Sequence, residues 1–204
     1  MRGVKFIVFI ILIVIVLIPT LSFSKPINIV TTLNFLEDIT TQIGKDRVKI
    51  VSILTGIENP HTYEAKPKDI IALSKADIFI EIGSGLEGFV DKILKNVKKK
   101  DLKIVILTED FQLINNNPHI WLDPENGKKM AEKIANALIS KSPENRKFFE
   151  ENLNIYLKKI DDAEEKAKKN LDKLSDKRVV SSLPTYIYFY KRFKKIRWEA
   201  NMML

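Results

Sequence analysis

The sequence alternates short β-rich runs with stretches of helical periodicity, and this alternation constrains the fold more than any other feature. The expected strands are residues 27–30, 48–54, 77–82 and 102–107. The expected helices between them are residues 31–43, a segment that begins at Pro67, and residues 86–98. Strands that alternate with helices of this length build βαβ units around a parallel sheet. We therefore predict an α/β fold with a parallel-sheet N-terminal lobe.

Two further helix starts follow this lobe. Asp123 is expected to cap a helix that has Pro124 at its first position, and Ser142-Pro143-Glu144 repeats the signature. The second start opens a helix that we expect to reach Leu174, or about 46 Å at ~1.5 Å per residue. One face carries a narrow apolar stripe, and acid-before-base pairs such as Glu164–Lys168 are expected on the other faces. A helix of this length predicts a spine between two lobes.

The chain is therefore predicted to have four segments. They are a signal peptide (1–24), an N-terminal α/β lobe (25–141), a long connecting helix (142–175) and the start of a truncated C-terminal α/β lobe (176–204). A second lobe is expected because a strand at 178–182 and a helix from Pro184 follow the long helix.

The first segment has the pattern of an export signal. Arg2 and Lys5 precede the apolar run Phe6–Ile18, and Ser22-Phe23-Ser24 offers small residues to a signal peptidase. The run has 13 residues, fewer than the ~20 that span a bilayer. We predict export, with an uncleaved membrane anchor as the alternative.

The sequence contains no cysteine, which excludes disulfides, thiolate metal sites and cysteine nucleophiles. We also predict that the protein is not lipidated and lies in a periplasmic or extracytoplasmic space, touching a membrane only through an uncleaved signal segment. The net charge is +8, but the lysines are spread among acids without interleaved aromatic residues. A nucleic-acid surface is therefore not predicted.

Both histidines of the chain, His61 and His119, end the tripeptide Asn-Pro-His. Proline fixes its own φ and extends the residue before it, so each imidazole is presented from a preset loop. Each loop follows a predicted strand, and ligands of open α/β sheets bind beyond the carboxyl ends of the strands. The pair predicts two imidazole ligands for zinc, with manganese or iron as alternatives. The simpler interpretation is two turn histidines without a shared role.

A second motif carries less weight. Gly83, Gly85 and Gly88 follow a predicted strand with the spacing of a nucleotide-binding turn. An acidic residue is expected at the end of the next strand, where Leu107-Thr108 stand instead. A tight strand-to-helix turn explains these glycines better, so no dinucleotide is predicted.

The motifs together resemble a known family. Asn59-Pro60-His61-Thr62-Tyr63-Glu64, the following Lys66-Pro67-Lys68-Asp69 and Leu73-Ser74-Lys75-Ala76-Asp77, and Pro118-His119-Ile120-Trp121-Leu122-Asp123-Pro124 resemble the solute-binding proteins of zinc and manganese ABC importers. The resemblance extends from about Ile27 to Phe193. It implies a metal held between two α/β lobes that a rigid helix joins, and delivery of that metal to a membrane permease. No reaction is catalysed by such a carrier.

The resemblance also implies roles for single residues. His61 and His119 match the first two metal ligands, Glu64 matches an additional or supporting position, and Asp123 matches a motif position that we interpret as a helix cap. Leu183 stands where the family usually has its third ligand, a histidine, and the fourth has no counterpart before the chain ends. Two imidazoles leave zinc short of its usual four ligands unless water or Glu64 completes the site, so weak binding is expected.

Three functions are compatible with these features to different degrees. The first is an exported binding protein that captures zinc or manganese for an ABC importer through a weakened site. The second is a truncated remnant or interaction module without useful metal binding. A zinc hydrolase is the third, and it is disfavoured because the sequence has neither His-Glu-x-x-His nor a third histidine.

Overall fold

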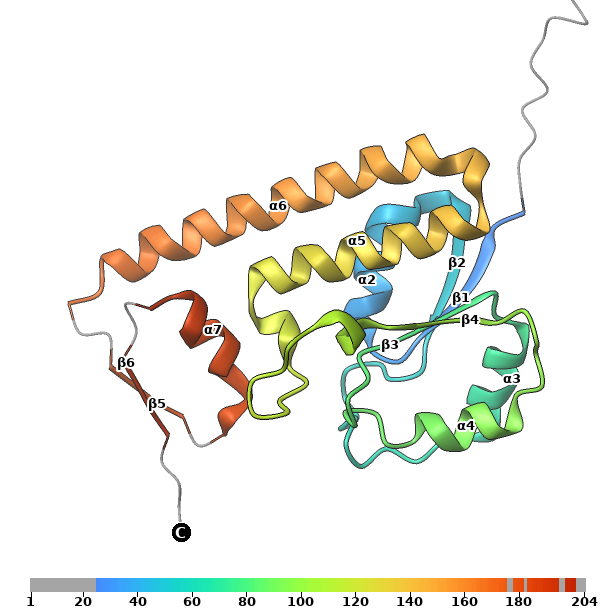
Figure 1. Ribbon diagram of the computed structural model, residues 1–204, viewed down its shortest axis with the longest axis horizontal. Helices are drawn as coiled ribbons and strands as arrows, with labels where there is room; N and C mark the ends of the chain where they lie inside the picture. The colour runs from blue at the N-terminus through green and yellow to red at the C-terminus, as the bar shows by residue number, and fades with distance from the viewer. Residues whose placement is uncertain (1–24, 176–177, 182, 195–196, 201–204) are drawn as a thin grey trace, which may run out of the picture.

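A four-stranded parallel sheet forms the centre of the N-terminal lobe (Figure 1). The computed structural model describes residues 25–175, 178–181, 183–194 and 197–200, so the predicted signal peptide lies outside the described residues. The strands are β1 (Ile27–Thr31), β2 (Val48–Ser52), β3 (Ile78–Glu81) and β4 (Lys103–Ile106), and they run in the order β2-β1-β3-β4. The predicted α/β class with a parallel sheet is confirmed.

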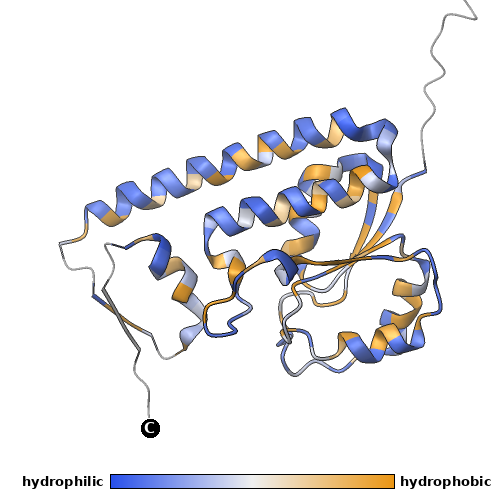
Figure 2. Ribbon diagram, in the orientation of Figure 1, coloured by the Kyte–Doolittle hydropathy of each residue, from blue (hydrophilic) through white to orange (hydrophobic). Residues whose placement is uncertain are grey.

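Helices cover both faces of this sheet. The helices α2 (Asn34–Gly44), α5 (Pro124–Lys141) and α6 (Arg146–Asp172) lie on one side, and α3 (Pro67–Lys75) and α4 (Val90–Asn96) lie on the other (Figure 1). Short 3₁₀ turns join them: η1 (Lys45–Arg47), η2 (Leu107–Asp110), η3 (Ile120–Leu122) and η4 (Pro143–Asn145). Central strands between two helical layers are apolar on both faces. All four residues of β3 are accordingly buried, whereas burial alternates along the edge strand β2, and Figure 2 shows the apolar strands beneath more polar helices.

Two helices, α2 and α4, begin later than the sequence predicts. The amide N–H of Thr32 donates to the carbonyl of Ile80 at 3.0 Å, which prolongs the β-ladder and delays α2 to Asn34. The helix α4 starts at Val90, and Gly83, Ser84 and Gly85 before it all have positive φ. The tight turn predicted at these residues is therefore confirmed.

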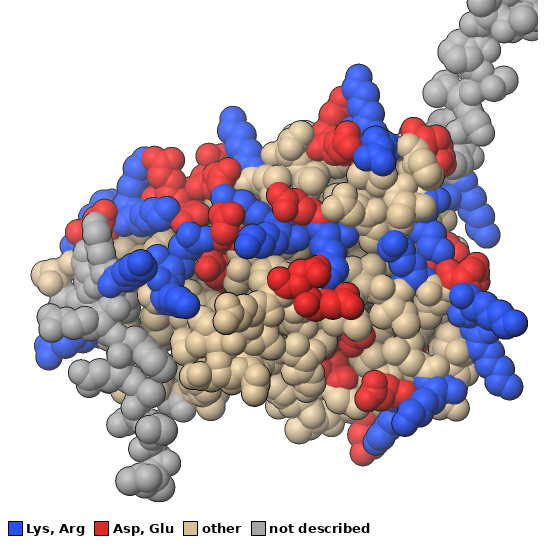
Figure 3. All heavy atoms as spheres, viewed as in Figure 1, with Lys and Arg blue, Asp and Glu red and all other residues tan. Residues whose placement is uncertain are grey.

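The long helix α6 is present, but its apolar stripe packs unevenly. Within α6, all of which is described, Phe149 and Glu164 are the buried residues, and just beyond its C-terminal end Leu174 is half exposed. Basic and acidic side chains are interspersed over this helix (Figure 3). The predicted ion pair Glu164–Lys168 is confirmed, with its nitrogen and oxygen 2.7 Å apart. Our placement of Glu164 on an outward face is wrong, since its carboxylate faces the helix α7 described next.

A second, smaller βαβ unit follows α6. The strand β5 (Arg178–Ser181) leads through η5 (Pro184–Tyr186) and α7 (Ile187–Arg192) to β6 (Arg197–Ala200), and β5 and β6 pair in parallel. The sequence predicts β5 and the helix after Pro184 but not β6. No helix in the part of the chain that the structure describes is long and apolar enough to cross a membrane.

Candidate metal site

The two Asn-Pro-His tripeptides share one local hydrogen bond. The amide N–H of His61 donates to Oδ1 of Asn59 at 3.0 Å, and that of His119 donates to Oδ1 of Asn117 at 2.9 Å. Each asparagine therefore closes a turn over the intervening proline and accepts from the histidine two residues later. The repeat in the sequence is therefore a repeat of this asparagine bond, and each loop presents one imidazole.

The two imidazoles meet although 58 residues separate them in the sequence. Their ring centres lie 5.8 Å apart, with an angle of 50° between the ring planes. Two imidazoles that share one tetrahedral zinc, with Zn–N bonds of about 2.0–2.1 Å, place their ring centres roughly 5 to 5.5 Å apart. The observed separation of the ring centres, 5.8 Å, is slightly longer than this range.

The sheet topology explains how the loops meet. His61 follows β2 and His119 follows β4, the two edge strands of the sheet. The chain passes from the central strand β1 outward to β2, and from the central strand β3 outward to β4 on the opposite side. The position between β1 and β3 is therefore a topological switch point. Ligands of open α/β sheets bind at such a point, beyond the carboxyl ends of the strands. The prediction that the two loops meet beyond the carboxyl ends of the strands is confirmed.

The ring of His119 is held in one orientation. Its Nδ1 lies 2.7 Å from Oδ1 of Asn117, and the indole of Trp121 packs against it with ring centres 5.1 Å apart. Burial lowers the pKa of His119, and the neighbouring His61 lowers it further. Both effects favour the neutral ring, which is the form that binds a metal. With Nδ1 bonded to asparagine, Nε2 is the nitrogen that can coordinate.

The other predicted site residues lie in positions less favourable for binding a metal. Glu64 is exposed and lines a cavity of about 520 Å³ that His61 also lines. Leu183, at the position where a third ligand was expected, is 63% exposed and apolar. Among the described residues, no three histidine, aspartate or glutamate side chains gather closely enough to hold a metal ion. Of the predicted site residues, the structure brings together His61 and His119.

Asp123 has a structural role. Its Oδ1 accepts from the amide N–H of Glu125 at 3.0 Å and therefore caps α5, as the sequence predicts. The same oxygen accepts from Nε of Arg192 on α7 at 2.6 Å. The carboxylate of Asp123 therefore accepts two hydrogen bonds, and the one from Arg192 connects the loop after His119 to α7.

The glycine-rich turn after β3 is filled by the protein itself. Glu87, which is buried, accepts from the amide N–H groups of Ile82 at 2.9 Å and Gly83 at 3.0 Å, and from the hydroxyl of Thr32 at 2.7 Å. Backbone N–H groups in such a turn are what a phosphate would meet. Here a carboxylate of the chain takes their place.

Comparison with known proteins decides the family. A family model described as "Zinc-uptake complex component A periplasmic" matches residues 29–195. The chain belongs to this family. The metal ABC transporter substrate-binding lipoprotein FimA of Streptococcus parasanguinis is 32% identical over 197 residues, which cover 87% of this chain and 64% of the relative. The manganese ABC transporter substrate-binding lipoprotein PsaA of Streptococcus pneumoniae is 32% identical over 199 residues, with 88% and 64% covered.

A solved structure agrees with this assignment. The Zn(II)-bound ZnuA-like domain of Streptococcus pneumoniae AdcA superimposes with a TM-score of 0.77 at 26% sequence identity, covering 88% of this chain and 68% of the other. The resemblance predicted from the sequence motifs is confirmed. The chain spans a little under two thirds of the length of its relatives FimA and PsaA.

One prediction about the protein's location is wrong. FimA and PsaA are named lipoproteins, which are anchored to a membrane, and this contradicts our prediction of a protein that is not lipidated. The prediction rested on the absence of cysteine alone. Without cysteine, the printed sequence offers no thiol for a lipid. This does not show how members of the family are held at a membrane.

Several residues around the site were missed by sequence reasoning. The family's Asn-Pro-His motif was noted for its histidines, but the two asparagines shape the loops through their side chains. Tyr188 and Arg192 contact the loop of His119 from α7. The repeated asparagine was a signal that could have been used, whereas nothing in the spacing of Tyr188 or Arg192 indicates their partners.

Proposed function

We propose that this chain captures a divalent transition metal outside the cytoplasm and delivers it to the membrane permease of an ABC importer, with His61 and His119 as metal ligands. The observation that carries the proposal is the meeting of two imidazoles at the carboxyl end of a parallel sheet, with ring centres 5.8 Å apart. The names of the relatives support it, since PsaA is a manganese transporter component and the AdcA domain is Zn(II)-bound. The relatives are transporter components rather than enzymes.

Zinc is the metal that we propose first. Imidazole nitrogen suits zinc well, and a given nitrogen and oxygen site generally binds zinc more tightly than manganese. The proposed site is weak because two imidazoles supply half of a tetrahedral zinc shell. Glu64 is proposed as a supporting ligand, together with water, and Asp123 remains a helix cap. A remnant without useful metal binding is not better supported than this carrier.

The proposed segments follow from the same family. Residues 1–24 are proposed as the export signal, residues 25–141 as the metal-binding lobe, residues 142–175 as the connecting helix, and residues 176–204 as the beginning of the second lobe. In this arrangement the second lobe starts beside the loop of His119, where η5 and α7 contact it.

A calorimetric titration tests the proposal. We expect the wild-type protein to bind one zinc ion saturably and manganese more weakly. The double variant His61→Ala/His119→Ala is expected to bind zinc at least about tenfold more weakly, which corresponds to ~1.4 kcal/mol or more. Thr62→Ala is the matched control, because Thr62 is exposed beside His61, and it should bind zinc as the wild type does. Equal zinc uptake by the double variant and the wild type would remove the proposed site.

A further inference from the structure

A buried tyrosine of the second βαβ unit forms hydrogen bonds with the loop that presents His119. The hydroxyl of Tyr188, on α7, donates to the carbonyl of Asn117 at 2.6 Å and accepts from the amide N–H of Ile114 at 3.1 Å. Tyr188 is 5% exposed, so water competes little for either bond. One hydroxyl therefore joins two points of the loop to α7.

The side chain of Asn117 makes the second connection, and it reaches the imidazole. Its Nδ2 donates to the carbonyl of Pro184 at 2.8 Å, while its Oδ1 lies 2.7 Å from Nδ1 of His119. The carbonyl of Pro184 can only accept, so the amide nitrogen must face Pro184 and the amide oxygen must face His119. The ring then carries its proton on Nδ1 and presents the lone pair of Nε2.

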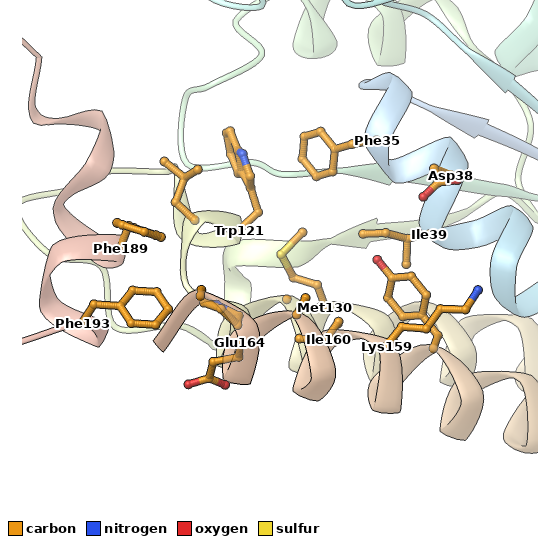
Figure 4. Close-up of a pocket in the computed structure, with 16 residues that line it drawn as sticks. Phe35, Asp38, Ile39, Trp121, Met130, Lys159, Ile160, Glu164, Phe189 and Phe193 are labelled. Carbon is orange, nitrogen blue, oxygen red and sulfur yellow. The ribbon is translucent and has the colours of Figure 1, made fainter. Parts of the chain in front are cut away.

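Besides these hydrogen bonds, Tyr188 and Ile187 of α7 pack against the apolar core, whereas Phe189 is half-buried and faces a cavity. A cavity of about 590 Å³ separates Phe189 of α7 and Phe193, which follows α7, from residues of the first lobe such as Phe35 and Trp121 (Figure 4). At the far end of the loop, Arg192 pairs with Asp123 at 2.6 Å. A helix that borders a cavity can undock more easily than one packed on every side.

We propose that Asn117 and Tyr188 are positioning residues that couple the coordination of metal by His119 to the docking of residues 184–192. Docked α7 holds the Asn117 amide, and the amide holds the imidazole in the tautomer that can coordinate through Nε2. This inference rests on the proposed function in taking His119 as a ligand. Coupling between two sites is reciprocal, so metal bound at His119 also stabilises the docked position of α7.

The first test needs no metal. Since the chain has two histidines, ¹⁵N-histidine labelling gives signals from two rings, and His61→Ala assigns them. At pH 8 we expect the Nδ1–H tautomer for His119 in the wild type. Asn117→Leu is expected to lose this preference, whereas Asn117→Asp keeps an acceptor for the ring and is expected to retain it. A wild-type ring protonated on Nε2, or an unchanged tautomer in Asn117→Leu, overturns the positioning role.

The second test measures the coupling. Tyr188→Phe is expected to bind zinc about fivefold or more weakly than the wild type, and Tyr186→Phe, on a half-exposed ring, is the matched control without effect. Zinc should slow hydrogen exchange of the amides of residues 187–192 in the wild type but not in Tyr188→Phe or His119→Ala. Unchanged affinity and unchanged zinc protection in Tyr188→Phe overturn the coupling.

The two tests separate failure of the inference from failure of the proposed function. If the wild type binds zinc through its histidines but Tyr188→Phe behaves like the wild type, the coupling is wrong and the carrier function stands. If the wild type does not bind zinc through its histidines, the proposed function fails and with it the coupling to metal. The tautomer of His119 then decides by itself whether Asn117 positions the ring.

Discussion

Replacing Phe149 by alanine is expected to lower the free energy of unfolding by about 3–5 kcal/mol. Phe149 is fully buried near the start of α6 and is the buried apolar residue of that helix. The helix α6 packs on α2 and α5, so Phe149 fixes the long helix to the layer that covers the sheet. Its removal leaves a cavity that the neighbouring helices cannot fill without moving, which adds to the lost hydrophobic burial.

Urea denaturation followed by circular dichroism measures this loss. Ile155→Ala is a control on the same helix, because Ile155 is 59% exposed and its truncation should cost within about 0.5–1 kcal/mol. Similar losses in both variants would show that α6 is not anchored through Phe149.

Glu81→Gln is expected to stabilise the protein by up to about 3 kcal/mol at pH 8. Glu81 is buried at the end of β3, and burial raises its pKa to about 7, with Glu87 and Asp91 adding to the rise. A carboxyl group whose pKa is raised on folding stabilises the fold in its protonated form. That stabilisation is complete below a pH of about 4.5, the unfolded value, and is lost as the pH rises toward 7. Glutamine imitates the protonated form at every pH.

Melting temperatures of the wild type and of Glu81→Gln between pH 4 and pH 8 test whether stability falls as the pH rises. The wild type should lose stability across the interval, and Glu81→Gln should lose less. A residual fall is expected in the variant because burial also raises the pKa of Glu87. Glu151→Gln, on the exposed side of α6, should follow the wild type at every pH. Equal pH profiles for Glu81→Gln and the wild type would contradict the raised pKa.

The sheet, its helices and the meeting of the two histidines could be predicted because each follows from local pattern. Strands that alternate with helices along the sequence predict a parallel sheet, and in a parallel sheet the carboxyl ends of all strands lie on the same side. His61 and His119 follow two of those strands, so their proximity required no knowledge of side-chain packing.

What was missed depends on contacts between distant parts of the chain. The bond from Asn117 to the carbonyl of Pro184 joins residues 67 positions apart, and it exists because of the place that α7 takes beside the loop. The burial of Glu164 has the same origin, since the guanidinium of Arg192 approaches it from α7 to 3.9 Å. Strand β6 is Arg-Trp-Glu-Ala and contains one strand-favouring residue, whereas the equally short β3 and β4 are rich in isoleucine, valine and phenylalanine.

The most direct test of the account is X-ray absorption at the zinc edge on protein loaded with one equivalent of zinc. We predict two imidazole nitrogens among the zinc ligands, at about 2.0–2.1 Å, with oxygen ligands completing the shell. His119→Ala should lose the scattering of one imidazole. Zinc bound without imidazole scattering in the wild type would contradict the central claim that His61 and His119 hold the metal.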